Sequence, residues 1–170
     1  VGYGGDNAEE VRDLMQEYGI SARLTFSNSL LRREHLSDRT CNALCTLFQK
    51  NCKAENGIIL CSELLMNYIR ECYPGFDFIS STTKMITDFD RLVDELNRED
   101  FRYVVPDFRL NKRFDRWDTL SELQKDKVEL LCNECCWFGC RDRKKCYENV
   151  SRKSLGELCE DHRCMAPASE

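Results

Sequence analysis

The sequence contains few residues that interrupt regular structure, and it has no long apolar run. Its 170 residues include only 3 Pro and 8 Gly, and 42% of them are hydrophobic. These values exclude collagen-like and disordered chains. No apolar stretch approaches the ~18–20 residues that a membrane span requires, and no signal peptide is recognisable. We therefore expect one globular domain that is cytoplasmic and not bound to a membrane.

The chain has no net positive charge, and histidine is scarce. The formal net charge is -5, so the chain lacks the overall basic character that drives nonspecific binding of nucleic acids. A local basic run, Arg141–Lys145, is expected either to touch an RNA backbone or to neutralise a metal cluster. Only 2 His are present, and no convincing Ser–His or Cys–His pair is found. Peptidase activity is therefore not expected.

Cysteine is unusually frequent for a globular chain, with 12 among the 170 residues. Such a content indicates either a secreted disulfide scaffold or a reduced chain with metal ligands. Disulfide scaffolds are usually small and rich in loops, whereas this sequence shows strong helix and strand patterns, which favours the reduced chain. Four cysteines are expected in the core, where a free thiol behaves as a small hydrophobic group: Cys41, Cys45, Cys61 and Cys72.

Helix and strand patterns alternate along the chain. An amphipathic helix is predicted over Ala8–Tyr18. Ser37 and Asp38 offer an N-cap for a second helix, and Asp88 is expected to cap a later one. Thr119 and Glu122 are expected to form a capping box. Five short apolar segments predict strands at Ala22–Ser27, Ile58–Cys61, Phe76–Ser80, Tyr103–Val105 and Val128–Cys132.

This alternation predicts an α/β fold in which helices cover a parallel sheet. Polar residues follow every predicted strand, which favours a β/α barrel, where all carboxyl ends face one mouth, over an open sheet. A closed barrel has eight strands and roughly 250 residues. We therefore expect a partial TIM-like barrel, its C-terminal five or six strand–helix units, in residues 1–134. A preceding portion or a partner chain would complete it, unless the sheet is open.

The polar residues at the predicted mouth are the candidate site. Asp107 and Arg109 alternate after the fourth strand, and a guanidinium group can hold a carboxylate through two parallel hydrogen bonds. Glu134 is placed to act as a general base. We therefore predict catalytic roles for Asp107, Arg109 and Glu134. The expected substrate-binding residues are Asn28, Glu63, Lys84, Asn111 and Asn133.

Residues 135–170 are expected to form a cysteine-rich, metal-binding segment of the same domain. Seven of the 12 cysteines lie from Cys132 onward. Clustered thiolates suit soft metals and iron–sulfur clusters. A zinc site built from two cysteine pairs, or with His162, fits the spacing equally well. The CxxxCxxC pattern is absent, because Arg143 stands at its third cysteine position after Cys136 and Cys140.

The run Asn133-Glu134-x-Cys136-x-x-x-Cys140-x-x-Arg143, followed by a distant Cys164, resembles a known family. It is similar to the iron–sulfur β/α-barrel proteins called collagenase-like peptidases, which include proteins of oxygen-independent ubiquinone and tRNA hydroxylation, and to their uncharacterised bacterial relatives. Arg141 stands where these relatives often have Pro, and Cys135 is an additional cysteine.

The resemblance implies a [4Fe–4S] cluster at the barrel mouth and favours iron–sulfur over zinc. It implies Cys136, Cys140 and Cys164 as ligands, with Cys146 as the fourth, or else Cys159 or Cys135. Hydroxylation-type chemistry on a small or tRNA-borne substrate follows from the same resemblance. The rival interpretations are a non-catalytic, zinc-stabilised interaction module and a secreted disulfide-bonded domain.

Overall fold

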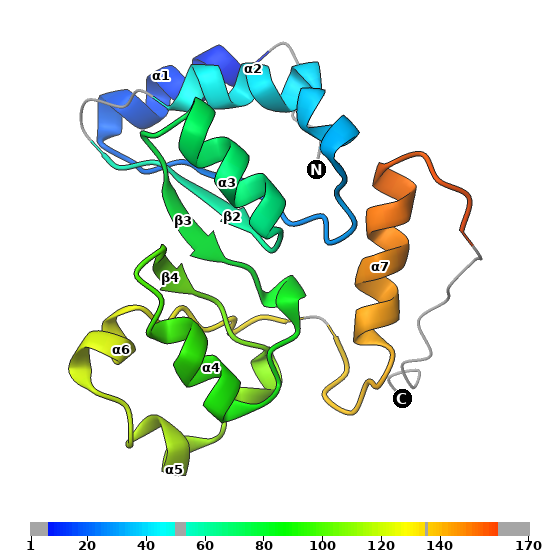
Figure 1. The fold of residues 1–170 in the computed structure, drawn as a ribbon. Helices are drawn as coiled ribbons and strands as arrows, with labels where there is room; N and C mark the ends of the chain where they lie inside the picture. Colours follow the sequence, from blue (N-terminus) through cyan, green and yellow to red (C-terminus); the bar gives the residue numbers. More distant parts are fainter. Residues whose placement is uncertain (1–6, 50–53, 135, 160–170) are drawn as a thin grey trace.

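The computed structural model describes residues 7–49, 54–134 and 136–159 (Figure 1). Four strands in this part form one parallel sheet in which each strand pairs with the next strand of the chain, in the order β1-β2-β3-β4. This confirms the predicted α/β class and the first four predicted strands. The strands are β1 (Arg23–Phe26), β2 (Gly57–Leu60), β3 (Asp77–Ser80) and β4 (Phe101–Val104).

Helices connect and follow the strands. None of the helices in the described part of the chain is long and apolar enough to cross a membrane. The α-helices are α1 (Ala8–Tyr18), α2 (Arg39–Phe48), α3 (Glu63–Cys72), α4 (Phe89–Leu96), α5 (Phe114–Trp117), α6 (Glu122–Asp126) and α7 (Arg143–Ser154). Three short 3-10 helices are η1 (Arg33–Ser37), η2 (Thr82–Lys84) and η3 (Phe108–Leu110).

Local signals set the ends of several helices as predicted. Helix α1 has the predicted bounds and ends at Gly19, whose left-handed φ of 65° suits a residue without a side chain. The carboxylate of Asp38 accepts a hydrogen bond of 2.7 Å from the N–H of Cys41. The carboxylate of Asp88 accepts one of 2.9 Å from the N–H of Arg91. Asp38 rather than Ser37 is therefore the cap of α2, and Asp88 is confirmed as the cap of α4.

The predicted capping box at Thr119 and Glu122 is wrong. Helix α6 begins at Glu122, and the box is formed by Ser121 and Gln124, with bonds of 3.3 Å from Gln124 N to Ser121 Oγ and 2.9 Å from Ser121 N to Gln124 Oε1. The hydroxyl of Thr119 instead donates to the carbonyl of Arg116. Ser121 satisfies the same sequence rule two residues later, which is why the pattern misplaced the box.

The main hydrophobic core lies on one face of the sheet. Leu24, Ile58, Phe78 and Phe101 are in register across the four strands and are all buried. They belong to one buried cluster with apolar side chains of α2, α3 and α4, including Cys45, Leu65, Ile69, Leu92 and Leu96. The helices between the strands therefore pack on the same face, as the amphipathic patterns predict.

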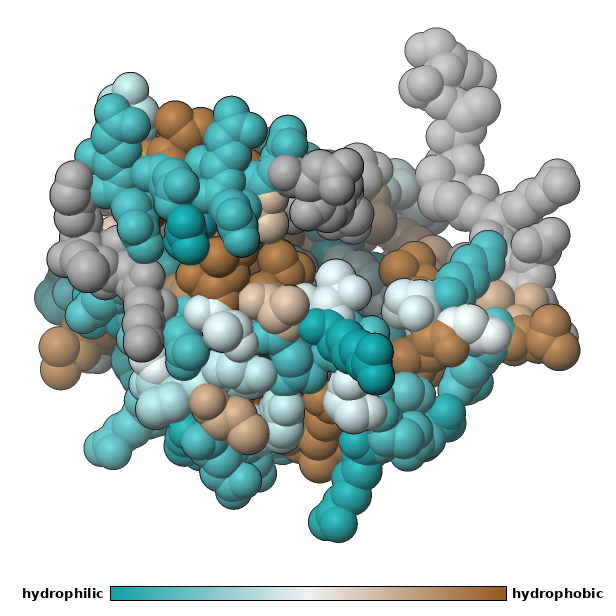
Figure 2. Space-filling view, turned by 90° about the horizontal axis from the view of Figure 1, so that it is seen from above, coloured by the Kyte–Doolittle hydropathy of each residue, from teal (hydrophilic) through white to brown (hydrophobic). Residues whose placement is uncertain are grey.

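Helix α1 covers the outside of this layer. None of its residues is buried, and Leu14 and Tyr18 are exposed. Figure 2 views the molecule from above and shows hydrophilic residues spread over this face with hydrophobic residues between them.

The opposite face of the sheet carries a second row of side chains, Thr25, Ile59, Ile79 and Tyr103, in register across the strands. Ile79 is buried, Ile59 and Tyr103 are half-buried and Thr25 is exposed. Ile79 does not belong to the main cluster. The sheet therefore has a second, partly apolar face that remains accessible in the described chain.

The sheet is strongly curled. Arg23 in β1 forms an ion pair with Glu129, and its guanidinium carbon lies 4.8 Å from the ring centre of Tyr103 in β4. Glu129 follows Val128, which lies beyond β4 and thus four strand positions from β1. At ~4.8 Å per position a flat sheet would place these segments roughly 19 Å apart, too far for the two side chains to meet. The second face is therefore concave.

The predicted fifth strand, Val128–Cys132, is wrong as a strand. Only Val128 pairs, through one isolated parallel bridge to Val104. The N–H of Val105 donates to the carbonyl of Ser80 in β3, on the opposite side of β4 from Val128. Pro106 has no N–H group. Because β4 has no further groups for pairing, the segment after Val128 leaves the sheet.

Of the four cysteines expected in the core, one is buried, one is half-buried and two are exposed. Cys45 is 1% exposed, and Cys61 is half-buried. Cys41 and Cys72 are exposed, so that expectation was wrong for both. Each lies in a terminal turn of its helix, where the apolar face is least covered. The cysteines that the structure describes are thiols without a disulfide bond: Cys41, Cys45, Cys61, Cys72, Cys132, Cys136, Cys140, Cys146 and Cys159.

Candidate functional site

The carboxyl edge of the sheet faces helix α7. Figure 1 shows α7 on the side toward which the strand arrows point. Only two residues of this helix are buried, Arg143 and Ser151, and both are polar. Helix α7 contributes no residue to the main hydrophobic cluster of the described chain. Polar contacts therefore attach it to the body.

Ser151 provides one of these attachments. The amide of Asn28 donates to the carbonyl of Ser151 at 3.0 Å and to the hydroxyl of Ser154 at 2.7 Å. The N–H of Ser29 donates to Ser151 Oγ at 3.2 Å. Asn28, predicted to bind substrate, thus uses its amide to hold α7 over the end of β1.

Arg143 provides the second attachment, within a group that we call the arginine–carboxylate cluster: Asp107, Arg109, Glu134 and Arg143. Arg109 donates to both oxygens of Asp107, at 2.6 and 3.0 Å. Arg143 Nη2 donates to Glu134 Oε2 at 2.6 Å, and Arg143 Nε lies 3.4 Å from Asp107 Oδ2. Asp107 is 0% exposed and Arg143 is 1% exposed. The cluster is thus a network of two cations and two anions in which Asp107 and Arg143 are buried and Arg109 and Glu134 are partly exposed.

The three predicted catalytic residues, Asp107, Arg109 and Glu134, are therefore brought together. Asp107 also caps η3 by accepting from the N–H of Arg109, and Glu134 accepts from the N–H of Cys136. The hydrogen bonds that Arg109 donates to Asp107 raise the pKa of Arg109. Burial lowers the pKa of Arg143, but the hydrogen bond to Glu134 and the nearby charges outweigh this and leave it raised. Both guanidinium groups therefore stay charged.

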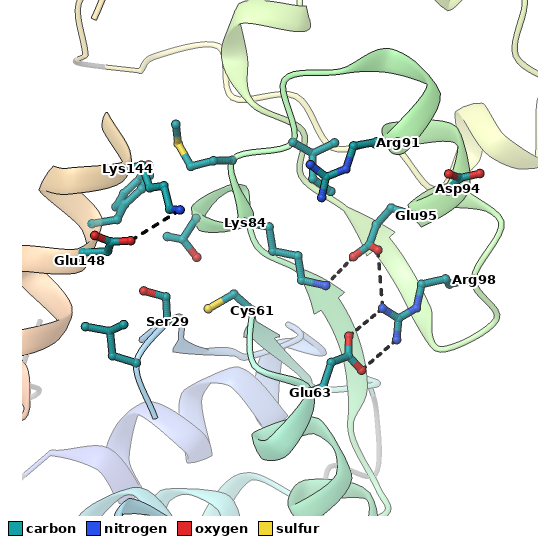
Figure 3. Close-up of a pocket in the computed structure, with 15 residues that line it drawn as sticks. Ser29, Cys61, Glu63, Lys84, Arg91, Asp94, Glu95, Arg98, Lys144 and Glu148 are labelled. Atoms are coloured by element: carbon teal, nitrogen blue, oxygen red, sulfur yellow. Dashed lines mark hydrogen bonds and ion pairs between the residues drawn. The ribbon is translucent and has the colours of Figure 1, made fainter. Parts of the chain in front are cut away.

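A pocket of about 720 Å³ lies between this edge and α7 (Figure 3). Its walls come from the segments after β1, β2 and β3 and from α4 and α7. Most of its charges are paired within it. Lys84 pairs with Glu95, and its ammonium group lies 4.3 Å from the ring centre of Phe101. Arg98 Nη1 donates to Glu63 at 2.7 Å. Glu63 and Lys84, two predicted substrate-binding residues, therefore line this pocket.

The remaining groups of the pocket suit a polar ligand. Arg91 is directed toward the pocket from α4, and no dashed interaction joins it to the other residues drawn in Figure 3. The thiol of Cys61 donates to the carbonyls of Ser27 and Asn28 at 3.3 Å each, and burial raises its pKa. Since a thiol with a raised pKa is a weak nucleophile, Cys61 is not activated for covalent chemistry.

Tyr147 connects the pocket with the cluster. It lines the pocket, and the guanidinium carbon of Arg143 lies 5.0 Å from its ring centre. Burial raises the pKa of Tyr147 to about 12, so its phenol stays neutral at pH 7. Sequence reasoning missed Tyr147, Arg143 and Glu95 as parts of the site. Tyr147 lies one helical turn after Arg143, which was the available signal.

The last two predicted substrate-binding residues do not line the pocket. The amide of Asn111 donates to the carbonyl of Leu131 at 2.8 Å and holds the segment before Glu134. Asn133 is exposed. Neither residue is among those that form the pocket wall.

The predicted metal ligands Cys136, Cys140 and Cys146 are half-buried thiols near the cluster. Arg109 donates to the carbonyl of Cys140 at 3.3 Å. Within residues 7–49, 54–134 and 136–159, no group of three or more His, Cys, Asp or Glu residues is arranged to hold a metal. Cys164, with the alternatives Cys135 and His162, lies outside the described residues. Cys136, Cys140 and Cys146 are therefore not gathered into one ligand group within the described residues.

Comparison with known proteins identifies a structural relative. No protein-family model matches the sequence. No curated protein matches it either. The fold is similar to the solved structure of the U32 peptidase Mk0906, with a TM-score of 0.59, 14% sequence identity and 90% of this chain covered. The chain spans 62% of the length of that structure. At this identity the likeness concerns the fold alone.

Proposed function

We propose that the chain is the C-terminal part of a parallel β/α barrel related to the U32, or collagenase-like, peptidases. Three observations support this: the unreversed strand order, the helices on one face, and the ion pair from Arg23 to Glu129 across the concave face. The fold likeness to a U32 peptidase of greater length agrees with it. Further strands, from a preceding portion or a partner chain, would then cover Ile59, Ile79 and Tyr103 and close the barrel.

We propose further that the carboxyl edge binds the substrate, a small polar molecule with a carboxylate group. The observation that carries this is the pocket under α7, because ligands of β/α barrels bind at the carboxyl ends of the strands. Its volume of about 720 Å³ lies within the usual range of small-molecule sites. Arg91, directed inward, supplies a donor for the carboxylate.

In this proposal the arginine–carboxylate cluster holds the pocket wall in place and does not contact the substrate. Asp107 is 0% exposed, so its carboxylate positions Arg109 and does not face the ligand. Peptide hydrolysis is not proposed, because the thiol of Cys61 is not activated and His35 accepts a hydrogen bond from the backbone of Arg32. Hydroxylation-type chemistry on a small or tRNA-borne substrate is implied by the motif resemblance alone.

Titration of the ¹⁵N-labelled full chain with succinate and with glycylglycine tests the pocket. We expect amide shifts at Thr83, Lys84 and Arg91, which line it. The variant Thr83→Trp should abolish these shifts, because the indole ring fills the pocket. The matched control Thr46→Trp, on the exposed side of α2, should preserve them. Shifts confined to other parts of the chain, or shifts that persist in Thr83→Trp, would contradict the proposal.

We also propose a thiolate-ligated metal centre, with Cys136 and Cys140 as two ligands and Cys164 and Cys146 as the others. Support comes from the motif and from the cationic guanidinium groups beside Cys136 and Cys140, which offset thiolate charge. A [4Fe–4S] cluster would supply electron transfer or Lewis acidity at the mouth. Zinc is the alternative and would favour a non-catalytic interaction module.

Anaerobic purification with assays for iron, sulfide and zinc, and for an absorbance band, tests the metal centre. Cys136→Ser and Cys140→Ser are expected to lose most of the metal, because each removes one thiolate ligand. The control Cys72→Ser, at an exposed thiol of α3, should retain it. Unchanged metal content in both motif variants would refute the ligand assignment, and disulfides throughout the purified chain would favour the secreted domain.

A further inference from the structure

The N-terminus of α7 has hydrogen-bond donors but no side-chain cap among the described residues. The side chain of Asp142, its N-cap residue, makes no capping hydrogen bond, and the first turn contains no acidic residue. The helical hydrogen bonds begin with Cys146 N to Asp142 O at 2.9 Å. Arg143, Lys144 and Lys145 occupy the first turn. Cations are unfavourable at the positive end of a helix, so this 12-residue helix begins where an anion would be stabilised.

A buried donor without an acceptor lies at the same end. Arg143 is 1% exposed; its Nε is held by the ion pair to Asp107 at 3.4 Å, whereas its Nη1 has no hydrogen-bond acceptor in the described chain. Because helical side chains lean toward the N-terminus, the guanidinium group of this first residue lies at that end, where it meets Glu134. Asp107 is already occupied by Arg109. The local carboxylates are thus used while donors remain, and a buried group of this kind calls for a ligand.

We infer that the first turn of α7 binds the phosphate group of a ligand, with Arg143 Nη1, the free N–H groups of the turn and the side chains of Lys144 and Lys145 as donors. A phosphate monoester carries about two negative charges and three acceptor oxygens. The site carries a surplus of one positive charge: the cations Arg109, Arg141, Arg143, Lys144 and Lys145 stand against the carboxylates Asp107, Glu134, Asp142 and Glu148, of which Glu148 pairs with Lys144. The three oxygens of a phosphate can accept from Arg143 Nη1 and from the N–H groups of the turn together, whereas a carboxylate offers only two oxygens.

The phosphate site adjoins the pocket but is distinct from it. Lys144 and Tyr147 line the pocket, and Tyr147 contacts Arg143. A ligand could therefore place its phosphate at the helix and its remainder in the pocket. The inference rests on the proposed function only for the part of the ligand that enters the pocket. Binding of inorganic phosphate tests the helix terminus independently of the pocket.

Titration of the ¹⁵N-labelled full chain with inorganic phosphate, at an ionic strength of ~0.15 M, tests the inference. We expect amide shifts at Arg143, Lys144 and Lys145. Arg143→Lys keeps a charge for Glu134 but removes Nη1 and should weaken binding on the order of tenfold. Lys145→Gln, at an exposed position, should weaken it roughly threefold without disturbing the cluster. The matched control Lys153→Gln, in the last turn of α7, should change it by less than about twofold.

Two further titrations distinguish a phosphorylated substrate from free phosphate, and the phosphate site from the pocket. Tighter binding of glycerol 3-phosphate than of inorganic phosphate would identify a phosphorylated substrate, and equal binding would identify free phosphate. Thr83→Trp should leave the binding of inorganic phosphate unchanged, so loss of the pocket and loss of the phosphate site are distinguishable. The inference is overturned if no amide of the first turn shifts, if acetate binds as tightly, or if Lys153→Gln is as damaging as Lys145→Gln.

Discussion

Replacing Asp107 by asparagine is expected to lower the free energy of unfolding by about 3–5 kcal/mol, which is typical of breaking a buried ion pair. Asp107 is 0% exposed and receives two hydrogen bonds from the guanidinium group of Arg109. It also lies 3.4 Å from Arg143, which is 1% exposed. Asparagine keeps the shape of the side chain but leaves the buried Arg143 with Glu134 alone and removes the carboxylate partner of the half-buried Arg109. Urea unfolding at pH 7, monitored by circular dichroism, measures the change.

The control for this prediction is Asp115→Asn. Asp115 also pairs with an arginine, Arg113, but its side chain is 68% exposed, so water screens the pair and the same substitution should lower the stability far less than Asp107→Asn does. Equal losses in the two variants would show that the buried position of Asp107 has no special role.

Replacing Phe101 by alanine is expected to lower the free energy of unfolding by about 3–5 kcal/mol, since the deleted ring leaves a cavity. Phe101 is 1% exposed and pairs with Phe78 across the sheet. Its ring centre also lies 4.3 Å from the ammonium nitrogen of Lys84 and 4.6 Å from the guanidinium carbon of Arg98. The change removes these cation–π contacts as well. Urea unfolding again provides the measurement.

Two variants serve as comparison for Phe101→Ala. Phe101→Leu retains most of the volume and should cost about half as much or less. Phe114→Ala removes the same group at a position that is 70% exposed and should cost less than about 1 kcal/mol. A result for Phe114→Ala as large as that for Phe101→Ala would mean that the core cluster is not the source of the loss.

The elements that could be predicted are those with local causes. Helix α1 follows from apolar spacing and from Gly19, and the starts of α2 and α4 follow from Asp38 and Asp88. The segment after Val128 is as apolar as the other strands, yet it pairs at one residue only. A strand needs partner N–H and C=O groups, and Pro106 limits what the chain after β4 can offer. Composition alone does not reveal that limit.

The candidate site was predictable in part for the same reason. Asp107 and Glu134 were recognised because polar residues after apolar segments gather at one edge of a parallel sheet. Their partner Arg143 lies in a helix that follows the cysteine-rich motif, so its position depends on how the chain returns to the edge. Glu95 was missed because a glutamate in an amphipathic helix is usually exposed, whereas here Ser80 and Lys84 bind it.

The attachment of α7 has a consequence for the order in which the protein unfolds. Arg143 and Ser151 connect the helix to the body through hydrogen bonds and ion pairs, which water replaces at little net free-energy cost. The sheet and its helices share an apolar core, whose loss is much more expensive. Helix α7 should therefore detach before the sheet unfolds, and its amide protons should exchange faster than those of α2, α3 and α4, which pack in the core. The local stability of this helix, not that of the whole fold, would then set the rate at which ligands enter and leave the pocket.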